Sequence, residues 1–217
     1  MINSIPVSLL SKMGNYEIEI HGAKVEVSVV ENPAVDVAAK IEELRSSLRT
    51  LQNRVVGLDI KFVETKRSSS IDKFLLLCVG TRCLIIQVLH LEYFPETLRE
   101  FLSDETICFL GTGMSNIVQD LDSRQSHVYY FNRWEKRSVR CKTGVEVGFL
   151  AAKILKKPNI EKYGFAELAG EIGMDIKLPI GECPHWNAQV FSHEEIKYAI
   201  HNAYTSYVIG NKLLGML

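Results

Sequence analysis

The sequence predicts an α/β fold, in which a mixed β-sheet is flanked by helices. Apolar and polar residues alternate over residues 16–30, which is typical of a strand pair. Three apolar runs between residues 54 and 89 indicate consecutive buried strands. The second half of the chain has apolar residues at helical spacing. Strands interleaved with and followed by helices in this order form a sheet that helices cover.

The first strand pair is expected on either side of His21-Gly22 and ends at Asn32-Pro33. One face of this hairpin is expected to carry Tyr16, Ile18, Ile20, Val25, Val27 and Val29. A helix is expected next, over residues 34–51. Its apolar positions have helical spacing and are Val37, Ile41, Leu44, Leu48 and Leu51.

The middle of the chain indicates strands joined by short turns. Residues 54–62 predict a buried strand, and the runs 68–80 and 81–89 predict an antiparallel meander. A helix is expected to begin at Pro95. Further elements are expected as a strand over residues 106–110, a helix over 114–121 and a strand over 127–131. The turn Gly111-Thr112-Gly113 lacks the third glycine and the lysine of phosphate-binding loops, which favours a sharp strand-to-helix turn.

From Val145 onward the sequence predicts helices, over residues 144–155, 165–173 and 192–214. Ser192 and Glu195 form a capping box that fixes the start of the last one. We expect one domain over residues 1–217, with an N-terminal hairpin and helix (16–51) and a core (55–213) that carries the motifs described below.

Composition narrows the classes of function. The 217 residues have a net charge of −1, which argues against a broad basic surface for nucleic acid. No apolar run reaches the roughly 20 residues of a membrane helix, and the N-terminus lacks the pattern of a secretory signal. The five cysteines are scattered, so we expect free thiols and a reducing compartment. These observations predict a cytoplasmic or nuclear protein that does not associate with membranes.

Three segments resemble the motifs of the Werner-type, DEDD 3′–5′ exonuclease superfamily. Residues 55–62 (VVGLDIKF) resemble its first motif, residues 109–121 (FLGTGMSNIVQDL) its second, and residues 196–213 (IKYAIHNAYTSYVIGNKL) its third. The resemblance runs from Tyr16 to the C-terminus and looks closest to small plant members, which include RISC-interacting clearing exoribonucleases. It implies a ribonuclease H-like fold and two-metal catalysis with Mg²⁺ or Mn²⁺ held by four carboxylates.

This chain departs from the family pattern at three of the four carboxylate positions. Asp59 is retained, and Tyr198 stands where the family has a tyrosine that positions water. Lys61 replaces the second acid of the first motif, Ile117 the acid of the second, and Asn202 the last acid. Asn116 corresponds to the second-motif acid only if the register slips by one residue.

The four positions have a summed charge of zero, whereas the intact site offers four negative charges to two divalent cations. Metal–ammonium repulsion at roughly 4 Å is at least a few kcal/mol. We therefore expect no metal cofactor at this degenerate site, with Asp59 as the single ligand if one binds. A structural interpretation of Asp59 and Lys61 is a partly buried ion pair. The histidines and Cys183 match no standard zinc spacing.

Two functions remain open. The first is a catalytically impaired member that binds single-stranded nucleic acid, RNA before DNA, or serves as a partner subunit of related exonucleases in an oligomer. The second is an active 3′–5′ exonuclease with an unconventional or interface-composed metal site, to which Glu64, Asp72, Asp120 and Asp122 are available. Candidate nucleic-acid contacts are Phe62, Arg133, Lys136, Arg137, Arg140 and Trp186. The basic run over residues 133–142 is also explained as a solvated loop.

Overall fold

The fold described here is that of a computed structural model. It describes residues 14–30, 34–64, 71–87, 95–123, 125–130, 133–177 and 191–217. The candidate contact Trp186 and the cysteine Cys183 lie outside the described residues.

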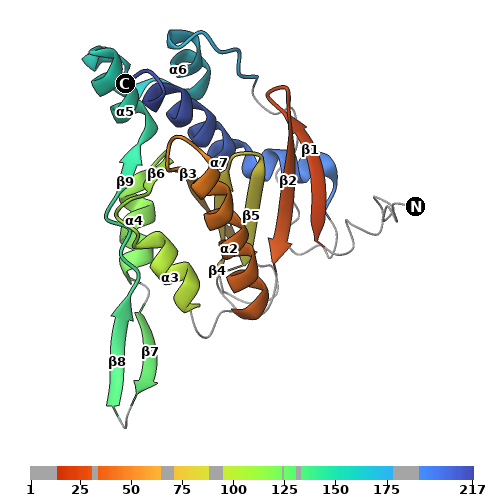
Figure 1. Cartoon of the computed structure of the whole chain (residues 1–217), viewed down its shortest axis with the longest axis vertical. Helices are drawn as coiled ribbons and strands as arrows, with labels where there is room; N and C mark the ends of the chain where they lie inside the picture. Colours follow the sequence, from red (N-terminus) through yellow and green to blue (C-terminus); the bar gives the residue numbers. More distant parts are fainter. Residues whose placement is uncertain are drawn as a thin grey trace.

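A mixed seven-stranded sheet forms the centre of the molecule (Figure 1). In their order across the sheet, the strands are β1 (Asn15–Ile20), β2 (Ala23–Val30), β5 (Arg82–Gln87), β4 (Ile71–Val79), β3 (Val55–Glu64), β6 (Cys108–Gly111) and β9 (Gly144–Glu146). The pairs β2–β5, β3–β6 and β6–β9 are parallel, and the other three are antiparallel. The predicted mixed sheet, N-terminal hairpin and central meander are confirmed.

The hairpin turns within two residues. Ile20 pairs with Ala23, and the intervening His21 and Gly22 have φ angles of 51° and 74°. Two positive φ angles are typical of the tight hairpin turn that matches strand twist. Positive φ angles are uncommon for residues other than glycine, and the contacts of the His21 ring are described with the site below.

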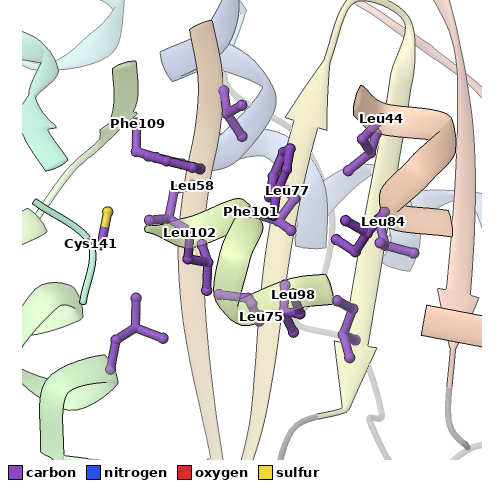
Figure 2. Close-up of a cluster of buried hydrophobic side chains, with 14 of the residues drawn as sticks. Leu44, Leu58, Leu75, Leu77, Leu84, Leu98, Phe101, Leu102, Phe109 and Cys141 are labelled. Carbon is purple, nitrogen blue, oxygen red and sulfur yellow. The ribbon is translucent and has the colours of Figure 1, made fainter. Parts of the chain in front are cut away.

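Helices cover both faces of the sheet (Figure 1). One face packs against α2 (Ala34–Thr50), α3 (Glu96–Leu102) and α4 (Met114–Ser123). Figure 2 shows the core of this face, where leucines of α2 and α3 meet those of β3, β4 and β5. The other face packs against the long helix α7 (His193–Leu214). A third cluster joins the C-terminal part of α7 to α5 (Val147–Leu155), the 3₁₀ helix η1 (Pro158–Lys162) and α6 (Phe165–Glu171).

Glycines allow α7 to lie close to the sheet. A Cβ atom on Gly57 of β3 would lie 1.8 Å from the carbonyl oxygen of Ala203, and one on Gly210 would lie 1.9 Å from Leu110 Cδ1. The helix begins as predicted, because the Ser192 hydroxyl accepts from the Glu195 backbone N–H and the Glu195 carboxylate accepts from the Ser192 N–H. Its position on the sheet brings the third motif against the first.

Two expectations for the second half are wrong. Residues 133–138 form a strand, β8 (Arg133–Ser138), rather than a loop, and β8 pairs with β7 (Gln125–Tyr130) in a separate antiparallel hairpin. This hairpin projects from the body of the molecule (Figure 1). Residues 144–146, predicted as the start of a helix, form the short parallel strand β9. Three residues are too few for strand alternation to be recognised in the sequence.

The expectation of free thiols is wrong for one pair of cysteines. Cys78 and Cys83 lie directly opposite each other on β4 and β5, and a disulfide joins them beneath α7. Cys108 and Cys141 are free, and burial raises the pKa of the Cys141 thiol to about 11. None of the helices in the described part of the chain is both long and apolar enough to cross a membrane.

Candidate functional site

Asp59 lies on β3 just beyond the end of the neighbouring strand. The only residues of β3 that pair with β6 are Val55, Val56 and Gly57, so Asp59 follows the point where this parallel pairing stops. The residue is 6% exposed, and its Oδ1 accepts a hydrogen bond of 2.9 Å from the Ile60 backbone N–H. In sheets of this kind, ligand sites lie outside the carboxyl ends of parallel strands.

Lys61 forms an ion pair with Asp59. The two side chains share a face of β3 because strand residues alternate with a period of two. Lys61 Nζ lies 2.6 Å from Asp59 Oδ2, and the lysine side chain is 25% exposed. The contact is a close ion pair in which the ammonium stabilises the charge of the buried carboxylate. The structural interpretation of this pair therefore agrees with the geometry.

Burial raises the pKa of the Asp59 carboxyl above its ordinary value. The positive charge of Lys61, the hydrogen bond from the Ile60 N–H and the nearby polar side chain of Asn202 partly offset this effect. Asp59 is thus a buried carboxyl whose charge is balanced by groups of the protein itself.

The first turns of α7 bring two predicted site residues toward β3. Asn202 lies near enough to Asp59 to lower the pKa of its carboxyl, and Tyr198 is half-buried one helical turn earlier. An amide at position 202 supplies no negative charge for a divalent cation.

The second motif does not contribute a polar group at the expected position. Ile117 of α4 is 5% exposed and packs into the core on the α2–α3–α4 face. Asn116 is exposed, and no described contact links it to Asp59. Asp120 forms an ion pair with Lys73, and Asp122 is exposed. Side chains of Glu64 and Asp72 lie outside the described part of the structure.

Two divalent ions do not fit the residues at this site. An ammonium lies at ion-pair distance from the single retained carboxylate, and the other two positions carry a neutral amide and a core isoleucine. Among the described residues, no three His, Cys, Asp or Glu side chains are grouped so that they could hold a metal.

A cluster of histidines beside the site was not predicted. His21 Nε2 lies 2.8 Å from the Thr205 hydroxyl. The His21 ring stacks on the ring of Tyr204, with 6.1 Å between the ring centroids. The centroid of the His201 ring lies 5.4 Å from the centroid of the His21 ring and 5.9 Å from that of the Phe165 ring. Burial, followed by the charges of His21 and Lys61, lowers the pKa of His201 to about 4. No sequence pattern links residues 184 positions apart.

Glu146 closes the glycine turn that follows β6. Its carboxylate accepts hydrogen bonds from the backbone N–H groups of Gly113, at 3.1 Å, and Met114 at the start of α4. A carboxylate at a helix N-terminus is favourable because it meets free N–H groups and the positive end of the helix dipole. The protein's own side chain occupies these donors, which agrees with the structural role predicted for the turn.

The predicted nucleic-acid contacts come from separate elements of the chain. Phe62 is 56% exposed, with Lys73 Nζ 5.4 Å from the ring centre, and it lies on the face of β3 opposite Asp59. Arg140 is exposed, and the other three basic candidates lie on β8.

A protein of Acanthamoeba polyphaga mimivirus, provisionally named a 3′–5′ exonuclease, is 23% identical over 188 residues. The match covers 78% of this chain and 42% of the viral protein. The likeness that the structure supports is one of fold, which the chain shares with 3′–5′ exonuclease domains. No family model matches the chain. The narrower likeness to small plant members stays a prediction.

Solved structures of two nucleases share the fold of this chain. Escherichia coli RNase D, an exoribonuclease involved in structured RNA processing, has a TM-score of 0.56 and 17% identity. That match covers 88% of this chain and 44% of RNase D. Brucella melitensis NrnC has a TM-score of 0.52 and 16% identity over 78% of this chain and 76% of its own. NrnC structures contain Mg²⁺ or pGG. This chain thus spans less than half of the viral relative and of RNase D.

Proposed function

We propose that this chain binds single-stranded nucleic acid, RNA before DNA, without two-metal hydrolysis. The observation that carries the proposal is the 2.6 Å ion pair between Lys61 and Asp59. It acts either alone or as a subunit beside active relatives.

The ion pair opposes metal binding in two ways. First, Lys61 satisfies the charge of the only retained carboxylate, so a metal must displace the ammonium before it can bind. Second, a displaced ammonium that remains nearby repels the ion, since at an effective dielectric of 20 two unit charges about 4 Å apart interact by roughly 4 kcal/mol. A divalent ion doubles that repulsion. Without the ions, nothing described at the site activates water or stabilises the leaving oxygen of a phosphodiester.

The same residues are compatible with holding a phosphodiester. Lys61 is partly exposed, Asn202 offers an amide, and Tyr198 is half-buried one helical turn before Asn202. These groups donate hydrogen bonds to phosphate oxygens without needing a metal. Binding that depends on side-chain cations weakens as salt rises, and it persists in a chelator.

The experiment is a time course with 5′-labelled single-stranded RNA in Mg²⁺, in Mn²⁺ and in EDTA, with electrophoretic binding measured in parallel. We expect bound RNA and no stepwise 3′ shortening in any buffer. Shortening by the wild type that disappears in Asp59→Ala would overturn the proposal in favour of an active exonuclease. Absence of binding in every buffer would overturn the nucleic-acid part.

Restoring carboxylates tests how the site was lost. Lys61→Glu with Asn202→Asp returns two acids to positions beside Asp59, and we expect this variant to bind Mn²⁺ more tightly than wild type by calorimetry. Ile117→Asp is less informative because it places a carboxylate in an apolar core, where burial of an unpaired charge destabilises the fold. The matched control is Lys61→Gln, which removes the ammonium without adding an acid.

A further inference from the structure

The turn of the β1–β2 hairpin carries a histidine where the backbone favours a smaller residue. His21 has a φ angle of 51°, and Lys156 is the only other non-glycine residue in the described ranges with a positive φ angle. Asparagine or glycine is the usual choice before Gly22 in such a turn, because a larger side chain in a left-handed conformation costs free energy. Strained residues of this kind are frequent at functional sites, which makes His21 a candidate.

The His21 ring joins the hairpin turn to α7. Its Nε2 lies 2.8 Å from the Thr205 hydroxyl. Lys197, His201 and Thr205 recur at intervals of four residues, so they form one stripe along α7, and the contact of Thr205 directs this stripe toward His21. Burial, followed by the charge of Lys197, lowers the pKa of His21. Lys197 therefore lies close to the hairpin turn.

This stripe of α7 adjoins the Asp59 site, which comprises Asp59, Lys61, Tyr198 and Asn202. His201 lies between the hairpin turn and that site. The centroid of its ring is 5.4 Å from that of His21, and the charge of Lys61 contributes to the lowering of its pKa. One lysine, Lys61, thus lies on the β3 side of His201, and a second, Lys197, lies one helical turn before His201 and close to the hairpin turn.

Lys197 is a cation without a described counter-charge. It is half-buried and forms no ion pair with any residue in the described ranges, and Glu194, one turn earlier, lies at the exposed start of α7. Strand alternation directs three hairpin acids away from α7: Glu17, Glu19 and Glu26. The turn itself is open, because a Cβ atom on Gly22 would meet nothing within 4 Å. An anion that reaches the turn is therefore attracted by Lys197.

We infer that His21 and Lys197 form a phosphate-binding site next to the Asp59 site, so that a single strand of nucleic acid is held by two of its phosphates, one at Lys61 and one at the hairpin turn. The inference rests on the proposed function. A neutral imidazole carries one N–H group. With Nε2 accepting from the Thr205 hydroxyl, Nδ1–H of His21 donates to a phosphate oxygen, and Lys197 supplies the positive charge.

The test measures the anisotropy of a fluorescein-labelled oligouridylate of about 12 nucleotides, in EDTA and at several salt concentrations. Lys197→Ala is expected to lower the slope of log affinity against log salt by about 0.7, which corresponds to one phosphate contact on a single strand. His21→Asn is expected to weaken binding about tenfold at constant slope, because it removes a hydrogen bond to a charged group but no charge. Asparagine before glycine is favoured in this turn, so the hairpin is retained.

Lys24→Ala is the matched control. Lys24 lies on the same hairpin, and its Nζ is 3.3 Å from Glu17 on the face away from α7. This variant changes the net charge of the chain as much as Lys197→Ala does, and it is expected to bind with the affinity and slope of the wild type. Circular dichroism and thermal melts verify the fold of each variant. Lys197→Ala removes no described ion pair, so it carries the test if His21→Asn does not fold.

The outcomes separate this inference from the proposed function. Affinity and slope that are unchanged in Lys197→Ala overturn the second phosphate site and leave Lys61 as the phosphate contact. If Lys24→Ala weakens binding as much as Lys197→Ala, net charge alone explains the effect, and the inference is overturned. If His21→Asn lowers only the Tm, the histidine serves the fold alone, which also overturns it. A wild type that binds no oligonucleotide overturns the proposed function itself.

Discussion

Replacing Lys61 with methionine removes the cation and keeps a side chain of similar length. Asp59 then remains a buried carboxyl with the Ile60 N–H and Asn202 as its partners. Since burial already raises the Asp59 pKa, loss of the ammonium raises it further. We expect Lys61→Met to be less stable than wild type at neutral pH.

The expected loss follows from the geometry of the pair. At 2.6 Å and an effective dielectric of 20 the gross attraction is roughly 6 kcal/mol, against which desolvation of two ions costs several kcal/mol. Exposed pairs are worth up to about 1 kcal/mol, and removal of one partner of a buried pair costs about 3–5 kcal/mol. A lysine that is 25% exposed lies between these limits, so we expect about 1–3 kcal/mol.

The effect depends on pH with a defined sign. A carboxyl whose pKa is higher in the folded than in the unfolded state binds its proton more tightly when folded, so stability falls as pH rises through the folded pKa. This fall is steeper in Lys61→Met than in wild type. Below the ordinary carboxyl pKa, Asp59 is protonated in both states and the difference between the two proteins shrinks.

The assay is a double-mutant cycle with Lys61→Met, Asp59→Asn and the double variant, measured by urea unfolding at neutral and acidic pH. A loss of 2 kcal/mol corresponds to a shift of roughly 4–8 °C in Tm for a chain of this size. The double variant is expected to recover most of the loss, because it buries no unpaired charge. A coupling energy within about 0.5 kcal/mol of zero is what independent sites give, and it would refute the ion-pair reasoning.

Three further predictions follow from the packing. Gly57→Ala places a Cβ atom 1.8 Å from the Ala203 carbonyl, so we expect a loss of about 3 kcal/mol or more in urea unfolding, or an insoluble protein. The pKa of His201 is lowered to about 4, so the unfolded state takes up the proton first as pH falls. We therefore expect the free energy of unfolding to fall by about 1–3 kcal/mol between pH 6.5 and 4. His201→Phe is expected to flatten this pH dependence in thermal melts. Glu146→Ala removes the acceptor at the start of α4 and is expected to cost about 1 kcal/mol, whereas unchanged stability means that water satisfies the N–H groups equally well.

Local patterns in the sequence were sufficient for most of the fold. The alternation around His21-Gly22 predicted the hairpin, and the Ser192 capping box predicted the start of α7, because both signals depend on neighbouring residues. The strand over residues 133–138 is not recognisable in the sequence, because its charged residues are typical of a solvated loop. It forms a strand by pairing with residues 125–130, and local sequence patterns do not indicate that pairing.

The candidate site was predictable only where it follows the motifs. Asp59, Lys61 and Asn202 lie together as the superfamily resemblance implied, whereas Ile117 is a core residue. The contact of His21 with Thr205 could not be predicted, because it depends on how α7 lies across the hairpin. Single-sequence patterns do not contain such distant pairs.

The placement of α7 has a consequence for how the chain is made. Its contacts reach back to the beginning of the described chain: His21 Nε2 lies 2.8 Å from the Thr205 hydroxyl, and Asn53 donates to the Asn211 carbonyl. During synthesis, the apolar sheet face that α7 covers stays open until the last of these residues leaves the ribosome. Until α7 is synthesised, the nascent chain therefore exposes an apolar surface, which is a state that chaperones recognise. A chain that ends before α7 exposes this surface permanently.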